Sequence, residues 1–287
     1  MLSDRNLNIP FKPLSGLLSG VPTAWVRIGG PDAATFLQGQ CTQDLRMLQS
    51  GDTAFVLWLS LKGKVMGESL VLKAESDAWW LWSAHTSGAA LVERLDEFVI
   101  ADDVTIVAGG LEWTQLTLAG DVGEAWLRLA REGRVRVWDW VRPAGLVAPI
   151  EVESAMLTEA ALRIDRLAVG VPAIPAEFGP GDLPQEAGLE TVAISFTKGC
   201  YLGQEVMARL QAMGQVRRRL VRVAGLGLAP AAGGELLQAG RRVGELRAAE
   251  HYGTGWLGLA MVNLLGLDRA AEICLAGGGA VSLVDYP

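Results

Sequence analysis

The sequence predicts an α+β protein in which a small β-barrel follows a larger mixed core. Short strand-like runs alternate with a few segments of helical spacing, and after Gly214 the chain changes to short β-like pieces separated by glycines. Hydrophobic residues make up 50% of the 287 positions, which is ample material for two or three packed units. We therefore expect an α+β core of two interleaved subdomains at 1–215 and a barrel at 216–287.

The core is predicted to begin with a strand and a helix. Residues 25–28 have strand character, and Gly30-Pro31-Asp32 then supplies a turn with a proline in the first turn of a helix carrying Phe36 and Leu37. Three extended runs follow, separated by the turn Leu61-Lys62-Gly63-Lys64 and by residues 75–77, and they predict an antiparallel meander. These runs are 53–59, 65–72 and 78–83.

The second half of the core repeats this mixture of elements. Helical spacing over 89–99 precedes strand character at 104–107 and 113–118, and a further strand–helix–strand alternation is expected through 125–129 and 135–140. These patterns predict two related α+β units that pack together.

A long loop and the barrel complete the chain. Prolines and glycines dominate 169–189, and we interpret this loop as functional because it is long and leads directly into the most polar run of the sequence. The barrel is predicted to begin near Val216, from β-like pieces at 220–223, 242–246, 256–261 and 280–284.

Composition excludes several classes of function. No signal peptide and no run of about 18 apolar residues is present, so we expect a cytoplasmic monomer that does not engage a membrane. A net charge of −7 argues against direct nucleic-acid binding. The three cysteines are far apart and outside any CxxC pair, and His85 and His251 lack ligand-spaced partners, so we predict neither disulfides nor a metal site.

The run from Phe196 to Glu205 concentrates chemically able side chains between two glycines. Gly199 and Gly203 would let the backbone approach a ligand, and a helix expected over 202–210 would direct its N-terminal dipole at Lys198 and Cys200. Cys200 is therefore a candidate reactive thiol. The alternative is that Cys200 is a small packing residue and Lys198 a solvated tether.

The helix after this cysteine strengthens the functional interpretation. Gln204, Glu205 and Arg209 can share one helical face, from which they could bind the donors and acceptors of a heteroaromatic ring.

Three other signals have simpler explanations. Residues 253–258 match GxGxxG but lack a surrounding βαβ unit, so we predict a barrel turn. Arginines at 217–219, 222, 241 and 242 could face a partner or RNA, but we interpret them as the solvated face of a strand. Trp79, Trp80 and Trp82 could stack on a pterin, yet a core position is favoured.

Lys198-Gly199-Cys200-Tyr201-Leu202-Gly203-Gln204-Glu205, followed by Ala208-Arg209, resembles the signature of the YgfZ family of folate-binding proteins. These proteins share the fold of the aminomethyltransferase of the glycine cleavage system. Segments 36–44, 62–64, 166–172 and 183–185 resemble further family stretches in the same order. The resemblance implies two intertwined α+β units around a central folate channel, and a C-terminal barrel.

The resemblance also implies a function and a set of residues. The family member would be an accessory protein that binds tetrahydrofolate or a derivative and supports iron–sulfur cluster assembly or repair in client enzymes, including enzymes that modify tRNA. Its partners would be iron–sulfur client or assembly proteins. Cys200 would be the redox-active or cluster-contacting thiol. The residues implied to hold folate are Arg166, Lys198, Tyr201, Gln204, Glu205 and Arg209.

A tetrahydrofolate-dependent aminomethyltransferase is the second hypothesis. The transferases carry an Asp-Asp pair where this chain has Gly67 and Glu68, and a folate-contacting glutamate where it has Ala168. Because a carboxylate must orient and activate the folate amine, these differences disfavour the transferase unless Glu68 substitutes. A pure interaction module without folate is the third hypothesis.

Overall fold

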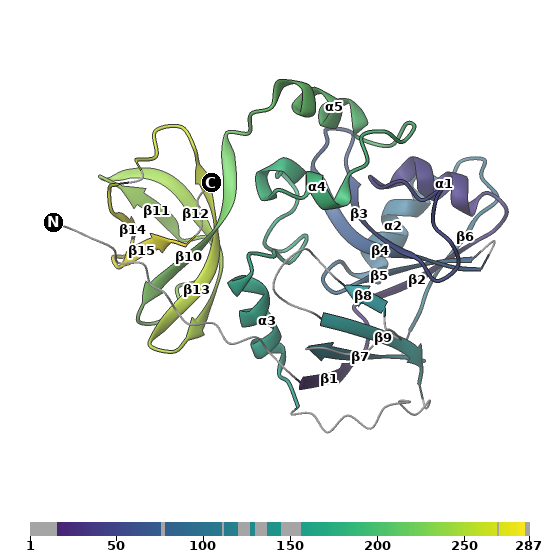
Figure 1. Ribbon diagram of the computed structural model, residues 1–287, viewed down its shortest axis with the longest axis horizontal. Coiled ribbons are helices and arrows are strands. Elements are labelled where there is room, and N and C mark those ends of the chain that lie inside the picture. The colour runs from purple at the N-terminus through teal and green to yellow at the C-terminus, as the bar shows by residue number, and fades with distance from the viewer. Residues whose placement is uncertain are drawn as a thin grey trace.

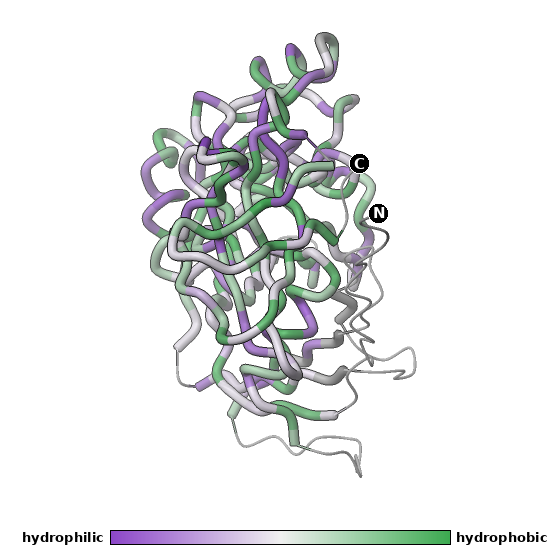
Figure 2. Tube along the Cα trace, turned by 90° about the vertical axis from the view of Figure 1, so that its left-hand side faces the viewer, coloured by the Kyte–Doolittle hydropathy of each residue, from purple (hydrophilic) through white to green (hydrophobic). Residues whose placement is uncertain are grey.

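The computed structural model describes residues 16–75, 78–110, 112–119, 127–129, 137–144, 156–268 and 270–284. Two β-sheets lie at one end of the molecule and a closed barrel at the other, with helices and a long loop between them (Figure 1). Hydrophobic and hydrophilic residues are interspersed along the trace (Figure 2). Among the residues described, no helix is long and apolar enough to cross a membrane.

The first sheet has five strands in the order β3-β4-β5-β2-β6. Its strands are β2 (Ala24–Gly29), β3 (Thr53–Leu59), β4 (Val65–Glu75), β5 (Ala78–Ser83) and β6 (Thr105–Ala108). β3, β4 and β5 pair antiparallel in sequence order, which confirms the predicted meander. One face is covered by α1 (Ala33–Gln40) and α2 (Gly88–Asp96), which bury Phe36 and Leu95 against Trp58 and Trp79 of the sheet.

The opposite face of this sheet meets a second sheet of order β1-β7-β9-β8. Its strands are β1 (Gly16–Gly20), β7 (Trp113–Ala119), β8 (Leu127–Leu129) and β9 (Val137–Pro143). Trp25, Leu70 and Trp82 of the first sheet pack with Trp113 and Val141 of the second. The core position favoured for Trp79, Trp80 and Trp82 is confirmed, since Trp79 and Trp82 are buried and Trp80 is partly buried against the same cluster as Trp82.

One predicted helix is wrong. Residues 127–129 form β8, which pairs antiparallel with β9. Leu127-Arg128-Leu129 alternates in polarity, so the segment is compatible with a strand, and pairing with β9 decides its conformation. Residues 125, 126, 135 and 136 of the same prediction lie outside the described part of the chain.

The segment between the sheets and the barrel is packed rather than open. α3 (Glu159–Ala168) is capped at its N-terminus by Thr158, whose side chain accepts a hydrogen bond from the backbone N–H of Ala161. The following loop contains a cis Ile174–Pro175 peptide, the 3₁₀ helix η1 (Pro184–Ala187) and α4 (Glu190–Ala193). α5 (Gln204–Met213) then follows, two residues later than predicted. This loop, α5 and β3 share one hydrophobic core. Its buried residues include Leu57, Leu59, Ile174, Phe178 and Met207.

The C-terminal strands form a closed barrel, in the order β10-β13-β12-β11-β14-β15. They are β10 (Arg218–Leu226), β11 (Glu235–Gln238), β12 (Arg241–Tyr252), β13 (Gly255–Asn263), β14 (Ile273–Leu275) and β15 (Ala280–Leu283). Trp256 fills the interior, and a Cβ on Gly225 would lie 2.6 Å from its indole. Gly253 and Thr254 connect β12 to β13, so the GxGxxG match is a barrel turn, as predicted.

The barrel contacts the loop through arginines. A solvated face is predicted for six arginines, and this holds for Arg217, Arg241 and Arg242, which are exposed, but is wrong for Arg218, Arg219 and Arg222, which donate hydrogen bonds to α3 or the loop. Arg218 makes two hydrogen bonds to Glu186, at 2.9 and 2.8 Å, and one to Asp182 at 3.2 Å. Arg247 reaches the same oxygen of Asp182 at 3.2 Å, and Arg222 donates to the carbonyl of Ala168. Asp182 and Glu186 are buried. Because buried carboxylates require partners, these arginines form part of the interface between the barrel and the loop.

Candidate functional site

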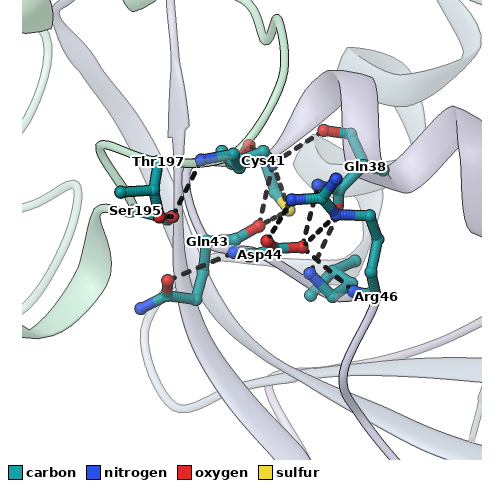
Figure 3. Close-up of polar contacts among 9 residues, drawn as sticks. Gln38, Cys41, Gln43, Asp44, Arg46, Ser195 and Thr197 are labelled. Carbon is teal, nitrogen blue, oxygen red and sulfur yellow. Dashed lines mark hydrogen bonds and ion pairs between the residues drawn. The ribbon is translucent and has the colours of Figure 1, made fainter.

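Two of the segments that carry the family resemblance lie against each other in the structure. Residues 36–44 form the end of α1 and the turn after it, and residues 192–202 run alongside this turn. Hydrogen bonds join Ser195 N to Thr42 O (2.9 Å), Thr42 Oγ1 to Ala193 O (2.6 Å), Gln43 Nε2 to Val192 O (3.3 Å) and Leu202 N to Gly39 O (3.2 Å). Figure 3 shows this region from Gln38 to Thr197. The contacts fix the loop that carries Cys200 to the end of α1 and the turn after it.

Lys198 is the central tie between the two segments. Its ammonium donates to the carbonyl oxygens of Gln38 (2.7 Å), Cys41 (2.7 Å) and Gln43 (2.8 Å), and the residue is only 4% exposed. These carbonyls lie at the C-terminal end of α1, where the helix dipole is negative. An ammonium has three protons, so each carbonyl can receive one. Lys198 is therefore neither a solvated tether nor free to donate to a ligand in this conformation.

The two cysteines of this region have different environments. Cys41 is fully buried, and burial raises the pKa of its thiol to about 11, against the attraction of nearby Lys198. Cys200 is exposed. Because thiol reactivity requires both access and thiolate, Cys200 is the accessible candidate here.

The loop around Cys200 is held on both sides of the cysteine. Tyr201 is buried, its ring lies 5.1 Å from the ammonium of Lys198, and burial raises the pKa of its phenol to about 12. Gly203 has φ +85°, and a Cβ there would lie 2.7 Å from the carbonyl oxygen of Ser60. Only glycine suits this position, because both the φ angle and the close approach exclude a side chain. The thiol therefore projects from a constrained turn.

The start of α5 places its polar side chains in different environments. Gln204 accepts a hydrogen bond from the amide of Tyr201 at 3.3 Å, whereas Glu205 and Arg209 are exposed. Gly63 of the β3–β4 turn packs against α5, since a Cβ there would lie 2.8 Å from both Val206 and Met207. The turn 60–64 therefore packs both against Gly203 of the loop 199–203 and against the start of α5.

Arg166 lies in α3 and is engaged by the loop that follows it. Its guanidinium contacts both carboxylate oxygens of Glu177, at 2.6 and 2.7 Å, and the carbonyl of Val171 at 2.6 Å. Although burial opposes ionisation, the hydrogen bonds and charge of Arg166 hold the pKa of Glu177 below its usual value. The pair braces the loop 171–177.

The positions of the transferase acids are also visible. A Cβ on Gly67 would lie 2.9 Å from the methyl carbon of Thr86, which leaves no room for an aspartate there without a shift. Glu68 is buried and accepts a hydrogen bond from the hydroxyl of Ser83 at 2.6 Å. Ala168 packs against Ala224 and Leu257 of the barrel.

A further buried acid, Asp139 in β9, is not among the residues that the sequence pattern singles out. It is 3% exposed and accepts a hydrogen bond from the amide of Gln115 at 2.6 Å. An acid between two tryptophans in a strand was the available signal. Over the described ranges, no group of three or more His, Cys, Asp or Glu side chains could hold a metal ion.

Comparisons with known proteins agree with this architecture. The model of the GCVT N-terminal domain matches residues 16–136, and that of the CAF17 C-terminal beta-barrel domain matches residues 217–285. The chain is 27% identical to the tRNA-modifying protein YgfZ of Edwardsiella ictaluri, over 94% of this chain and 93% of that one. It is 28% identical to the YgfZ protein of Serratia proteamaculans, over 90% and 87%.

A solved structure supports the fold independently. The glycine cleavage system aminomethyltransferase T from Bartonella henselae superposes with a TM-score of 0.74, at 15% identity, over 95% of this chain and 86% of that one. The predicted α+β, aminomethyltransferase-like fold with a C-terminal barrel is therefore confirmed.

Proposed function

We propose that this chain is a member of the YgfZ family, with the aminomethyltransferase fold, and a folate-binding accessory protein supporting iron–sulfur cluster assembly or repair in client enzymes. The clients would include enzymes that modify tRNA, as the name of its relatives suggests. In this proposal the protein is a cytoplasmic monomer, with a folate-binding core at 1–215 and the barrel domain at 216–287.

The observation that carries the proposal is the exposed thiol of Cys200 on a loop anchored from within by Lys198. An accessible cysteine held in one place suits transient contact with a client or with a cluster in transfer. One cysteine cannot hold a cluster alone, so the remaining ligands would come from the partner.

The bound cofactor would be tetrahydrofolate or a derivative. Glu205 and Arg209 are exposed on α5 near Cys200, and Gln204 lies at the start of the same helix, so these three side chains suit polar groups of the ligand. We assign Arg166, Lys198 and Tyr201 an indirect part, because their described contacts hold the loops that would frame the ligand.

The aminomethyltransferase remains the second candidate because of Glu68. This carboxylate is buried beside Ser83, next to the site where the transferases place their acid. The steric limit at Gly67 weighs against it, since an aspartate at that position would meet Thr86.

Calorimetric titration with tetrahydrofolate tests the proposal. We expect saturable binding by the wild type and by Cys200→Ala, with loss of a radical iron–sulfur enzyme's activity only in cells carrying Cys200→Ala. Cys274→Ala, a change in the barrel, is the matched control and should retain both properties. Absence of folate binding would refute the proposal and the transferase alike, whereas formation of methylene-tetrahydrofolate from an aminomethylated lipoyl carrier would establish the transferase.

A further inference from the structure

The first sheet has an unpaired edge along β6. Within the described ranges, β6 stands at the end of the strand order and pairs only with β2, on the side of the molecule away from the barrel (Figure 1). The backbone N–H of Gly109 donates to the carbonyl oxygen of Trp25 at 2.6 Å, so positions 105, 107 and 109 are the ones that hydrogen-bond to β2. Because hydrogen-bonded positions alternate in an antiparallel ladder, the N–H and C=O groups of Ile106 and Ala108 point outward from the sheet.

This edge carries no side chain that would prevent the addition of a further strand. Thr105-Ile106-Val107-Ala108 contains neither a charged residue nor a proline, the two kinds of residue that commonly protect an edge strand. Val107 is 58% exposed, and Ile100, in the connection from α2 to β6, is 90% exposed. An added strand would bind the outward backbone groups and cover these apolar side chains, so the edge suits β-augmentation.

Acidic side chains gather at the N-terminal end of β6. α2 contacts β6, and the connection between them leads directly into the strand. The exposed acids of α2 and this connection are Glu93, Asp96, Glu97 and Asp103. Two cations lie nearby: Arg94 is half-buried and donates to the carbonyl oxygen of Leu59 at 2.8 Å, and Arg27 is exposed opposite Val107. The acids outnumber these cations, so a strand with cations at the matching end is favoured.

The same charges argue against two other occupants of the edge. Antiparallel pairing of two β6 strands would set the acids of one copy beside Glu112 of the other, which is exposed, and parallel pairing would set acids beside acids. Nucleic acid is disfavoured because its phosphates are anionic.

We propose that β6 binds an extended basic segment of a protein partner by β-augmentation. All strand pairs of the first sheet are antiparallel, so the added strand runs antiparallel to β6 and its C-terminal end lies beside the acidic connection 96–103. The segment recognised therefore has alternating apolar residues followed by lysine or arginine. This surface depends neither on folate binding nor on Cys200, and it gives the protein a second place at which a partner binds.

Fluorescence anisotropy with labelled synthetic peptides tests the proposal. In one peptide valine alternates with threonine and lysines follow, and in the other the same residues have the lysines at the N-terminus. We expect the wild type to bind the first peptide saturably, and about fivefold more tightly than the second. Ala108→Pro removes an outward N–H that β2 does not use, and should weaken binding of the first peptide about tenfold. Ala108→Ser keeps this N–H and is the matched control.

Hydrogen exchange separates strand addition from attraction between charges alone. The amides of Ile106 and Ala108 should become protected when the first peptide binds, and absence of this protection would overturn the proposal. Equal affinity of the wild type and Ala108→Pro, or no binding of the first peptide by the wild type, would overturn it too.

Two further measurements keep the test decisive. Should Ala108→Pro not fold, Ile100→Ser, a change at an exposed side chain, should weaken binding about threefold, and an unchanged affinity would count against the proposal. Dimers of the free wild type in light scattering that Ala108→Pro abolishes would show that a second copy occupies the edge, and would overturn the assignment to a basic partner.

Discussion

Replacing Lys198 by methionine should destabilise the protein through three carbonyl groups at once. The change removes three charge-assisted hydrogen bonds of 2.7 to 2.8 Å to Gln38, Cys41 and Gln43, while a methionine keeps an apolar stem of similar length. A buried carbonyl without a donor costs about 1–3 kcal/mol, and loss of the desolvated ammonium offsets part of the sum. We therefore expect a net loss of about 3 kcal/mol, taken from the lower end for each carbonyl.

Thermal unfolding followed by circular dichroism measures this loss. For a chain of this size, about 3 kcal/mol corresponds to a fall in Tm of roughly 6–12 °C. Lys62→Met is the matched control, since Lys62 is exposed in the neighbouring turn, and its Tm should change by about 2 °C or less. Amide hydrogen exchange should also accelerate at Leu202, whose N–H donates to Gly39. A Tm for Lys198→Met equal to that of Lys62→Met would refute the structural role assigned to Lys198.

Three further outcomes follow from the described contacts. Arg218→Met leaves two buried carboxylates with fewer partners, so it should lower the free energy of unfolding, measured in urea, by about 3 kcal/mol. Arg242→Met, an exposed change in β12, is the control and should alter it by about 0.5 kcal/mol or less. Equal effects of the two changes would contradict the interface between barrel and loop. Burial raises the pKa of Asp139 from 3.8 to about 6, so the free energy of unfolding of the wild type falls as pH rises through this window. Asp139→Asn has no carboxyl group to ionise, so its free energy of unfolding should gain up to about 3 kcal/mol relative to the wild type between pH 4 and pH 8. If the difference between Asp139→Asn and the wild type in urea unfolding did not change with pH, the raised pKa of Asp139 would be contradicted. Under native conditions a thiol reagent should modify Cys200 rapidly and Cys41 only after unfolding, and mass spectrometry of digested protein would reveal the reverse order if the assignment of accessibility were wrong.

Local patterns predicted the elements whose side chains follow a simple period. The extended runs at 53–59 and 78–83 became β3 and β5 with the same bounds. The helix carrying Phe36 and Leu37 formed as α1 because both residues bury against one sheet face. β11 and β14 were not predicted, since they have four and three residues and derive their pairing from the closed barrel.

The destinations of the charged side chains could not be predicted in the same way. Lys198 donates to carbonyls 155 to 160 positions away in sequence, and backbone oxygens leave no signal in the residue types that carry them. Arg218 stands in a strand at a position where a solvated residue would also be expected. Only the folded chain brings it to Asp182 and Glu186. The motif around Cys200 predicted a candidate site because its residue types are rare elsewhere. It did not distinguish a buried side chain such as that of Lys198 from an exposed one such as that of Cys200.

The contacts also explain why the barrel matters to the cysteine loop, although the two are separate in sequence. Arg218 and Arg247 hold Asp182, and the carbonyl of Asp182 accepts from the amide of Val65 at 3.0 Å, where β4 leaves the turn 60–64. This turn also contains Ser60, whose carbonyl oxygen lies against Gly203. Asp182 and Gly203 are both buried, so loss of the barrel's arginines should loosen the turn and with it the support beneath Cys200. Faster amide exchange at Val65 in Arg218→Met, with unchanged exchange in α2, is the expected result, and exchange confined to the barrel would contradict this connection.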